Sequence, residues 1–444
     1  MAGEQVQERV LILGAGVAGL QAAVDLTAAG KKVYLVDRSP TLGGLMPRLD
    51  RTFPTHDCHM CLIAPPAEDR RGCLRGGVVA ERLPGLELLA ATELLQLEGT
   101  PGNFRATLVT GPRFIAPELC TTCGQCAEVC PVGAVSDYNA GLEERRAAYL
   151  PSPQAVPRVY AIEAETCTRC GACVEACPTG AIDLERPSQQ RQVTVGAVIL
   201  ATGSQVFNPT QLTSYLFGRH PNVITNLAFE RLWSGTGPTG GRLVRPSDGQ
   251  EPRKIAWLQC IGSRDHNTHL YCSAFCCMSA VKEVRMLKDR LPNAEATIFY
   301  MDLRTTGKGY EPYAQQVLAQ PGVRLINYRV PELWPAPEDR LRILYPGLEG
   351  HKVAEDFDLV ILSVGFEPVP GLSELATRLG VELNSLGYPV TQPWNLVATS
   401  RPGIFVCGAA QAPKDIPESI TEASAAAAAV LAEMPPTTTG TEVS

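Results

Sequence analysis

Two cysteine runs in this chain share the spacing C-x2-C-x2-C-x3-C-P. The first comprises Cys120, Cys123, Cys126, Cys130 and Pro131, and the second comprises Cys167, Cys170, Cys173, Cys177 and Pro178. Such runs are typical of paired [4Fe–4S] clusters, in which three cysteines of a run bind one cluster and the fourth crosses to the other. We therefore expect one cluster on Cys120, Cys123, Cys126 and Cys177, and a second on Cys167, Cys170, Cys173 and Cys130.

Structural zinc is the alternative for these runs, because paired C-x-x-C motifs also bind Zn²⁺. Zinc sites usually show two separated pairs, rather than four cysteines with a trailing proline that occur twice. The spacing therefore favours iron–sulfur clusters, which transfer single electrons.

A third group of cysteines lies further along the chain and comprises Cys260, Cys272, Cys276 and Cys277. A vicinal pair is a poor geometry for an ordinary disulfide, and four soft ligands in a short span suit another iron–sulfur centre. The alternative is a set of buried, inert thiols. We expect a third cluster in a second Rossmann-like unit, at the place where a nicotinamide domain would carry its glycine fingerprint.

A glycine motif near the N-terminus predicts a nucleotide site. The apolar segment Arg9–Gly14 leads into Gly14-Ala15-Gly16-Val17-Ala18-Gly19, then a helical stretch Leu20–Ala29 and a second apolar segment Lys32–Asp37. In such a βαβ unit the glycines make the turn, admit a pyrophosphate and allow close packing, while the helix N-terminus faces the phosphate. Asp37 is placed to bind a ribose; the alternative is a solvated strand end.

Several later segments favour FAD over NAD and resemble the flavoprotein family that includes thioredoxin reductase. The resemblance implies flavin contacts from the following residues: Arg38, Gly43, Gly44, Leu45, Ala201, Thr202, Gly203, Gly408, Ala409 and Ile416. That family usually has aspartate where this chain has Ala409, which leaves the usual ribityl contact in question. A helix beginning near Pro417 would place its positive dipole end at the flavin ring.

Cys58 and Cys61 form a C-x-x-C motif after the nucleotide motif. Three interpretations stay open: a redox-active dithiol facing the flavin, ligands of a further cluster, or a structural role. The spacing does not discriminate among them.

Alternating strand and helix patterns predict an α/β fold with parallel sheets. We expect two Rossmann-like domains of the thioredoxin reductase type with an inserted 2[4Fe–4S] ferredoxin domain. The predicted limits are 1–112, 190–210 and 370–434 for the FAD domain, 113–189 for the insert, 211–369 for the second domain and 435–444 for a disordered tail.

Composition excludes several classes of protein. The net charge of −7 gives no electrostatic footprint for nucleic acid, and no apolar run is long enough to predict a membrane span. Clustered cysteines without a secretory signal indicate a reducing cytoplasm.

Four runs closely resemble the A subunit of heterodisulfide reductase: Phe53–Pro65, Gln259–Asp265, Tyr271–Met278 and Gln411–Pro417. The resemblance spans nearly the whole chain. It implies an FAD-containing electron-transfer subunit in which the third cysteine group holds a non-standard [4Fe–4S] cluster, giving three clusters. It also implies that Lys282 acts near the flavin N5; the alternative is a surface lysine paired with a neighbour. The chain begins at the first strand and ends near the last helix, so we expect neither the extra N-terminal domain nor the second ferredoxin domain of the methanogen form.

The resemblance implies a cytoplasmic oxidoreductase of anaerobic metabolism that splits flavin electron pairs along cluster chains, with flavin-based electron bifurcation as an option. Expected partners are chains resembling the B and C subunits of heterodisulfide reductase and an electron donor, with a dimer as one possible assembly. Two alternatives stay open: the A subunit of a quinone-interacting membrane-associated oxidoreductase complex, and a stand-alone NAD(P)H-dependent flavin disulfide-type reductase. A third hypothesis is a scaffold in which the clusters only brace the fold.

Overall fold

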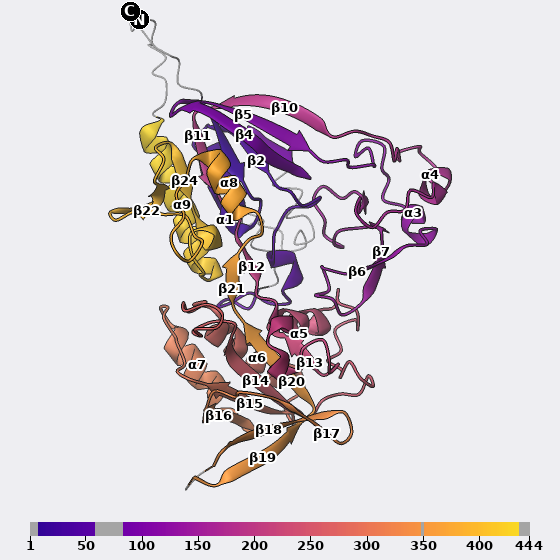
Figure 1. Ribbon diagram of the computed structural model, residues 1–444, viewed down its shortest axis with the longest axis vertical. Helices are drawn as coiled ribbons and strands as arrows, with labels where there is room; N and C mark the ends of the chain where they lie inside the picture. Colours follow the sequence, from indigo (N-terminus) through magenta and orange to yellow (C-terminus); the bar gives the residue numbers. More distant parts are fainter. Residues whose placement is uncertain (1–7, 58–82, 348–349, 435–444) are drawn as a thin grey trace, which may run out of the picture.

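The computed structural model describes residues 8–57, 83–347 and 350–434. Cys58, Cys61 and the predicted tail 435–444 lie outside these residues, and what the sequence indicates for them stays a prediction. Two sheets with parallel strands form two bodies, and a smaller insert lies beside them (Figure 1). The predicted α/β fold class is confirmed. Within the described ranges, none of the helices has the length and apolar character needed to span a bilayer.

The first body is built on a seven-stranded sheet. Its strand order is β22 (Thr391–Gln392), β23 (Asn395–Thr399), β24 (Ile404–Val406), β11 (Ala197–Leu200), β1 (Arg9–Leu13), β2 (Lys32–Val36) and β3 (Leu86–Leu89). The strands from β24 to β3 are parallel, whereas β22 and β23 run antiparallel at one edge. The central strands are almost wholly apolar because both faces of the sheet are covered.

Different layers cover the two faces of this sheet. Helices α1 (Val17–Ala28) and α9 (Ile416–Glu433) pack together on one face. An antiparallel sheet of β4 (Thr92–Thr100), β5 (Asn103–Thr110) and β10 (Gln189–Val195) covers the other face, with α8 (Leu372–Leu379) beside β4. The glycine turn between β1 and α1 therefore lies at the carboxyl edge of a rigid parallel sheet.

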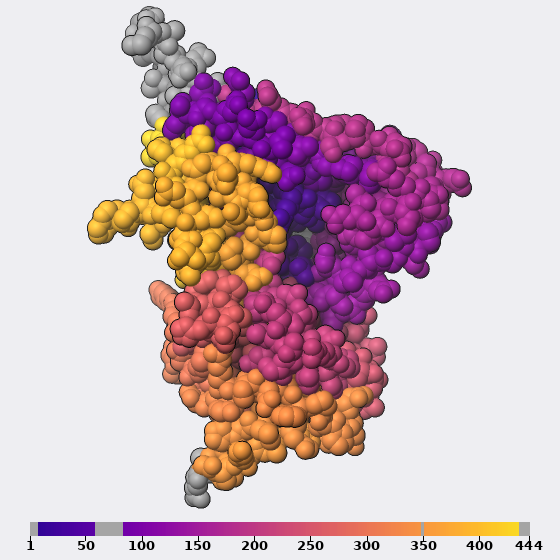
Figure 2. Space-filling model, viewed as in Figure 1, coloured from indigo at the N-terminus to yellow at the C-terminus, as the bar shows by residue number. Residues whose placement is uncertain are grey.

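The cysteine-rich insert leaves the first body after β5 and returns at β10. These two strands are neighbours, so the insert begins and ends at adjacent points. Its elements are α3 (Gln125–Glu128), β6 (Gly133–Val135), β7 (Glu144–Arg146), β8 (Ala148–Tyr149), β9 (Ala161–Ile162) and α4 (Ala172–Glu175). A small core of its own includes Phe114, Ile115 and Ile182. Figure 2 shows the surface hollowed beside this magenta insert, where indigo N-terminal residues are visible.

The second body has a five-stranded parallel sheet. Its order is β13 (Val223–Thr225), β20 (Leu359–Val364), β14 (Lys254–Ile261), β15 (Glu295–Tyr300) and β16 (Val323–Asn327). Helices α5 (Asn226–Trp233), α6 (Cys276–Arg290) and α7 (Tyr310–Leu318) share a core with one face. The antiparallel strands β17 (Trp334–Ala336), β18 (Arg340–Pro346) and β19 (Lys352–Phe357) cover the other.

A short antiparallel pair joins the two bodies. Strand β12 (Ser204–Val206) leads into the second body, and β21 (Phe366–Pro368) leads back out of it. The two crossings of the chain therefore lie side by side (Figure 1). The predicted domain limits themselves stay a prediction.

Candidate functional site

The glycine turn predicted to bind a dinucleotide has different constraints at its three glycines. Gly14 has a φ of +107°, and a Cβ there would overlap the carbonyl of Ala201. A Cβ on Gly19 would overlap the Gly14 carbonyl, so α1 can approach the turn only with glycine at that position. Gly16 differs, because a Cβ there would point into open space. The turn thus leaves room at Gly16 for a phosphate to approach the backbone.

This turn lines a cavity of about 300 Å³. Its wall includes most of the predicted flavin-binding residues: Gly14, Gly16, Val17, Ala18, Asp37, Gly43, Gly44, Leu45, Ala201, Thr202, Gly203, Ala409 and Ile416. The second body contributes the opposite side through α5, α6 and the start of α7. A ligand in this cavity would therefore contact both bodies.

The other predicted flavin-binding residues lie behind the wall or beside it. The Ala15 amide donates to Asp37, Gly19 packs on the turn, and the Gly408 amide donates to Glu422 Oε2 at 3.1 Å. Arg38 lines a second cavity of about 260 Å³, whose wall shares Gly14, Asp37 and Thr202 with the first. A long ligand could therefore span both cavities past Asp37.

The Asp37 carboxylate is held in one orientation at this boundary. It accepts hydrogen bonds from the amides of Ala15 at 2.7 Å and Ser39 at 2.8 Å. Burial raises the pKa of Asp37, whereas these two amides and the Arg38 charge lower it. The Asp37 side chain is therefore partly buried and held by backbone amides, and its binding of a ribose stays a prediction.

Three features of the cavity fit a bound flavin dinucleotide. The N-terminus of α1 has no side-chain cap, so the amides of its first turn can bind phosphate. Thr202 Oγ1 and Asn226 Oδ1 are buried without a hydrogen-bond partner among the described residues, and both residues line the cavity. Because buried polar groups are normally hydrogen-bonded, a ligand with donors would complete these two sites.

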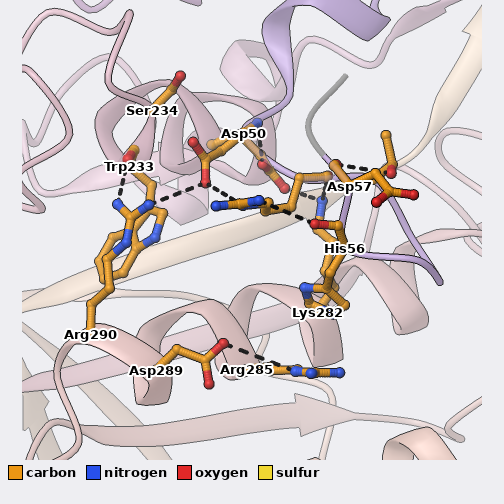
Figure 3. A network of polar contacts seen from close by, with 12 residues as sticks. Asp50, His56, Asp57, Trp233, Ser234, Lys282, Arg285, Asp289 and Arg290 are labelled. Carbon is orange, nitrogen blue, oxygen red and sulfur yellow. Dashed lines mark hydrogen bonds and ion pairs between the residues drawn. The ribbon is translucent and has the colours of Figure 1, made fainter. Parts of the chain in front are cut away.

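A buried ion pair lies in the cavity wall. Lys282 on α6 pairs with Glu230 on α5, and both side chains are nearly inaccessible to solvent. Lys282 Nζ also donates to the Arg51 carbonyl at 2.9 Å, and the Asp50 amide donates to Glu230 Oε2 at 2.8 Å. Figure 3 shows Lys282 and Asp50 within this polar network. The alternative is therefore wrong in placing Lys282 at the surface but right in pairing it with a neighbour, and the role of Lys282 at a flavin stays a prediction.

A second buried carboxyl group, Glu283, also lines the cavity. Its oxygens accept hydrogen bonds from Trp257 Nε1 at 2.8 Å and from Ser279 Oγ at 2.9 Å. Burial and then the nearby Glu230 carboxylate raise the pKa of Glu283 to about 8. The pocket thus contains a carboxyl group that stays protonated near neutral pH.

Replacing Glu283 with glutamine should flatten the pH dependence of stability. The pKa of Glu283 is raised from 4.5 to about 8, so in this window the folded chain keeps a proton that the unfolded chain releases. Glu283 therefore contributes fully to the free energy of unfolding below its unfolded pKa, and this contribution is lost as pH rises through its folded pKa. The slope of the free energy of unfolding is at most about 1.4 kcal/mol per pH unit. Urea unfolding of both proteins across this window measures the slopes. Equal slopes would contradict the assignment.

The N-terminus of α9 reaches the cavity, as predicted, but carries a carboxylate at its cap. Asp415 accepts a hydrogen bond from the Glu418 amide at 2.9 Å within a capping box, and Tyr310 of the second body donates to Asp415 Oδ2 at 2.7 Å.

Sequence reasoning missed the lining residues Asn226, Glu230, Tyr310, Lys414 and Asp415. Lys414 and Asp415 belong to a run already singled out by its family resemblance, which was the available signal for them.

The insert brings its cysteines together in the two crossed groups that the spacing predicts. Cys120, Cys123, Cys126 and Cys177 line one small cavity. The Cys173 thiol lies beside Cys167, Cys130 and Cys170, and burial followed by these neighbours raises its pKa. Burial raises the pKa of Cys126 to about 12. A bound metal would displace this proton, because cysteine ligates as the thiolate.

The third cysteine group lies next to the flavin-type cavity. Cys260 at the end of β14 meets Cys276 and Cys277 at the start of α6, and all three are buried. A hydrogen bond with Cys276 lowers the pKa of Cys260 to about 7 despite burial. Cys272 Sγ accepts the Ala274 amide at 3.3 Å, and Ala274 lines the cavity. The loop that leads from Cys272 to Cys276 is therefore also part of the cavity wall.

None of these groups resembles a site for a single ion. In residues 8–57, 83–347 and 350–434, no three Cys, His, Asp or Glu side chains converge closely enough to hold one metal ion. In an iron–sulfur cluster the thiolates bind separate iron atoms, so their sulfurs need not converge on one point.

Models of three protein families match parts of the chain. A 4Fe-4S dicluster domain matches residues 119–182, an FAD dependent oxidoreductase matches 9–52, and a pyridine nucleotide-disulphide oxidoreductase matches 290–427. The first match covers both cysteine runs, and the second covers the glycine turn and Asp37. With the cavity and the cysteine groups, these matches define an oxidoreductase that carries FAD and [4Fe–4S] clusters.

Curated relatives then specify the family. A protein from Archaeoglobus profundus, named as similar to the A subunit of heterodisulfide reductase, is 37% identical over 97% of this chain and 67% of its own length. The chain belongs to the family of heterodisulfide reductase A subunits. Iron-sulfur A subunit 2 of the CoB–CoM heterodisulfide reductase of Methanopyrus kandleri is 42% identical over 95% of the chain. The A subunit of the H(2):CoB-CoM heterodisulfide,ferredoxin reductase of Methanothermobacter marburgensis is 37% identical over 95%. The chain spans 64% and 63% of these two relatives.

Solved structures of low sequence identity also align with the chain. Thioredoxin reductase from Lactococcus lactis has a TM-score of 0.49 at 15% identity and covers 96% of this chain and 98% of its own. Thioredoxin reductase from T. acidophilum has a TM-score of 0.47 at 15% identity and covers 97% of this chain and 99% of its own.

Proposed function

We propose that this chain is the FAD- and [4Fe–4S]-containing electron-transfer subunit of a heterodisulfide reductase-like complex. One observation carries the proposal: the same chain has a flavin-type cavity and two sets of grouped cysteines. One set lies in the insert, and the other lies at the cavity wall. Such an arrangement suits a relay that takes electrons in pairs and passes them on singly.

In this relay FAD supplies the exchange between paired and single electrons, and the clusters accept electrons one at a time. The α1 N-terminus and Gly16 would hold the pyrophosphate, and Asp37 would hold a ribose. The buried Lys282–Glu230 pair and the protonated Glu283 are the groups that can hold or move a proton at the cavity wall. Apolar residues such as Met46 and Phe275 exclude water from the same wall.

The proposal includes a third cluster on Cys260, Cys272, Cys276 and Cys277. The support is the proximity of three of these buried thiols and the shared loop that carries Ala274 and Phe275 into the cavity wall. Clusters on two sides of a flavin would provide two separate paths along which single electrons could leave it. That arrangement is what electron bifurcation needs, and the name of the Methanothermobacter relative includes both a heterodisulfide and a ferredoxin.

The expected partners are chains resembling the B and C subunits of heterodisulfide reductase and an electron donor, in the cytoplasm. The support is that the relatives are named as A subunits of reductases. A pull-down from the source cells under anaerobic conditions tests this assembly.

Iron counting tests the number of clusters. Anaerobically purified protein should contain one FAD and about twelve irons per chain, from three cubanes. A Cys276→Ala variant should lose about four irons and keep the flavin. A wild-type count near eight would remove the third site, and colourless protein with only Zn²⁺ would remove the whole proposal.

A rival function is a stand-alone NAD(P)H-dependent flavin reductase, which the pyridine nucleotide-disulphide oxidoreductase match at 290–427 favours. Against it, β14 ends in Cys260 and Ile261 and the next helix, α6, begins only at Cys276, so no glycine turn leads directly into a helix there. Anaerobic mixing with NADH and NADPH separates the two: prompt bleaching of the isolated chain would favour the rival.

A further inference from the structure

One buried arginine joins the insert to both bodies of the protein. Arg231 on α5 follows Glu230 and is fully buried. Its Nε donates to Asn139 Oδ1 of the insert at 2.9 Å, and its Nη2 donates to Thr236 Oγ1 of the second body at 3.0 Å. Its Nη1 donates to the Arg48 carbonyl of the first body at 3.4 Å. A single guanidinium therefore contacts three separate parts of the chain.

The insert meets this arginine through a short, half-buried loop. The guanidinium carbon lies 4.2 Å from the centre of the Tyr138 ring, and the Tyr138 hydroxyl shares a hydrogen bond with Thr236 Oγ1 at 3.0 Å. Asn139 is 5% exposed, and two nearby residues, Ala140 and Leu142, pack against the core of the second body. The contact is therefore a packed junction rather than a surface encounter.

The same turn of α5 also holds the wall of the flavin-type cavity. Glu230 binds the Asp50 amide and Lys282, while Arg231 binds Arg48 two residues before Asp50. Arg290 strengthens this link, because it donates to the Trp233 carbonyl at 2.9 Å and pairs with Asp50 at 3.6 Å (Figure 3). Consecutive residues of one helix therefore fix the cavity wall and the insert.

We propose that Arg231 is a positioning residue that sets the placement of the insert's clusters relative to the flavin. In each transfer one electron leaves one centre and reduces the other, so the rate depends on how closely the two are held. Lysine cannot replace arginine here, since it lacks the planar fork that reaches several acceptors at once and stacks on a ring. This role rests on the proposed function, because it needs clusters in the insert and a flavin in the cavity.

The test compares electron transfer in the anaerobic holoprotein with variants on each side of the junction. Arg231→Lys changes the helix side, and Asn139→Ala removes the acceptor on the insert together with the Asn139 donor to Glu143. We expect both variants to keep their flavin, iron and cluster potentials. After rapid one-electron reduction with titanium(III), transfer from clusters to flavin, followed by flavin absorbance, should slow by about tenfold or more, given the steep cost of misplacement.

The control is Arg146→Lys at an exposed arginine of the same insert, which should transfer at the wild-type rate. If Arg231→Lys loses its cofactors, Asn139→Ala decides the question, because it leaves α5 whole. Wild-type rates in a variant that keeps its cofactors would overturn the role of Arg231. A wild-type protein without any transfer between clusters and flavin would overturn the proposed function itself, and this role with it.

Discussion

Replacing Lys282 with methionine is expected to destabilise the fold by about 3–5 kcal/mol, the cost of breaking a buried ion pair. The change leaves Glu230 without its ammonium partner at a buried site, where Glu283 is a second carboxyl neighbour. It also removes the donor to the Arg51 carbonyl, which holds the cavity wall. Urea unfolding under anaerobic conditions measures the loss.

The double variant Lys282→Met/Glu230→Gln separates charge from packing in this prediction. Neutralising both partners removes the unpaired charge, so much of the lost stability should return. The matched control Lys352→Met, at an exposed lysine on β19, should change stability by less than about 0.5 kcal/mol. A single variant no less stable than this control would show that the pair contributes nothing to the fold.

Gly19→Ala is expected to destabilise the fold, whereas Gly16→Ala is not. Both variants are expected to lose their flavin. At Gly19 the added Cβ overlaps the Gly14 carbonyl, so backbone must move at a cost of about 1–3 kcal/mol or more. At Gly16 the Cβ enters open space, so the chain should fold normally. Both variants should lose FAD, because the Gly16 methyl occupies the space that a pyrophosphate requires and the Gly19 methyl displaces the turn itself.

Flavin content and urea unfolding, measured together, distinguish the two glycines. Gly235→Ala is the control, since a Cβ there also meets open space and the residue is absent from the cavity wall. It should keep both stability and flavin. Full flavin content in Gly16→Ala would mean that the cavity does not bind the pyrophosphate at this turn.

Local sequence patterns predicted the regular elements of the parallel sheets closely. The predicted helix near Pro417 is α9, which begins one residue earlier, and the apolar segment Lys32–Asp37 matches β2 to within one residue. Apolar runs in buried parallel strands and glycines at turns are signals contained in a few adjacent residues. The antiparallel sheet of β4, β5 and β10 was not predicted as a sheet, because β10 pairs with β5 across the whole insert.

The site was predictable where one motif contains it and obscure where distant segments meet. The glycine turn, Asp37 and the cysteine runs each carry their chemistry within a fixed spacing. The pairing of Glu230 with Lys282, and of Arg231 with Asn139, depends on how segments far apart in the sequence pack together. No periodicity marks such a contact, so the polar network of Figure 3 became visible only in the fold.

Among the described residues, the cavity wall has no unpaired lysine or arginine side chain. Its two lining lysines are each committed to a carboxylate, Lys282 to Glu230 and Lys414 to Glu422. At the N-terminus of α9 the capping carboxylate of Asp415 offsets the positive end of the helix, whereas the N-terminus of α1 has no side-chain cap. A negative charge added beside these lysines therefore meets carboxylates that are already paired with them, which favours uptake of a proton together with each electron.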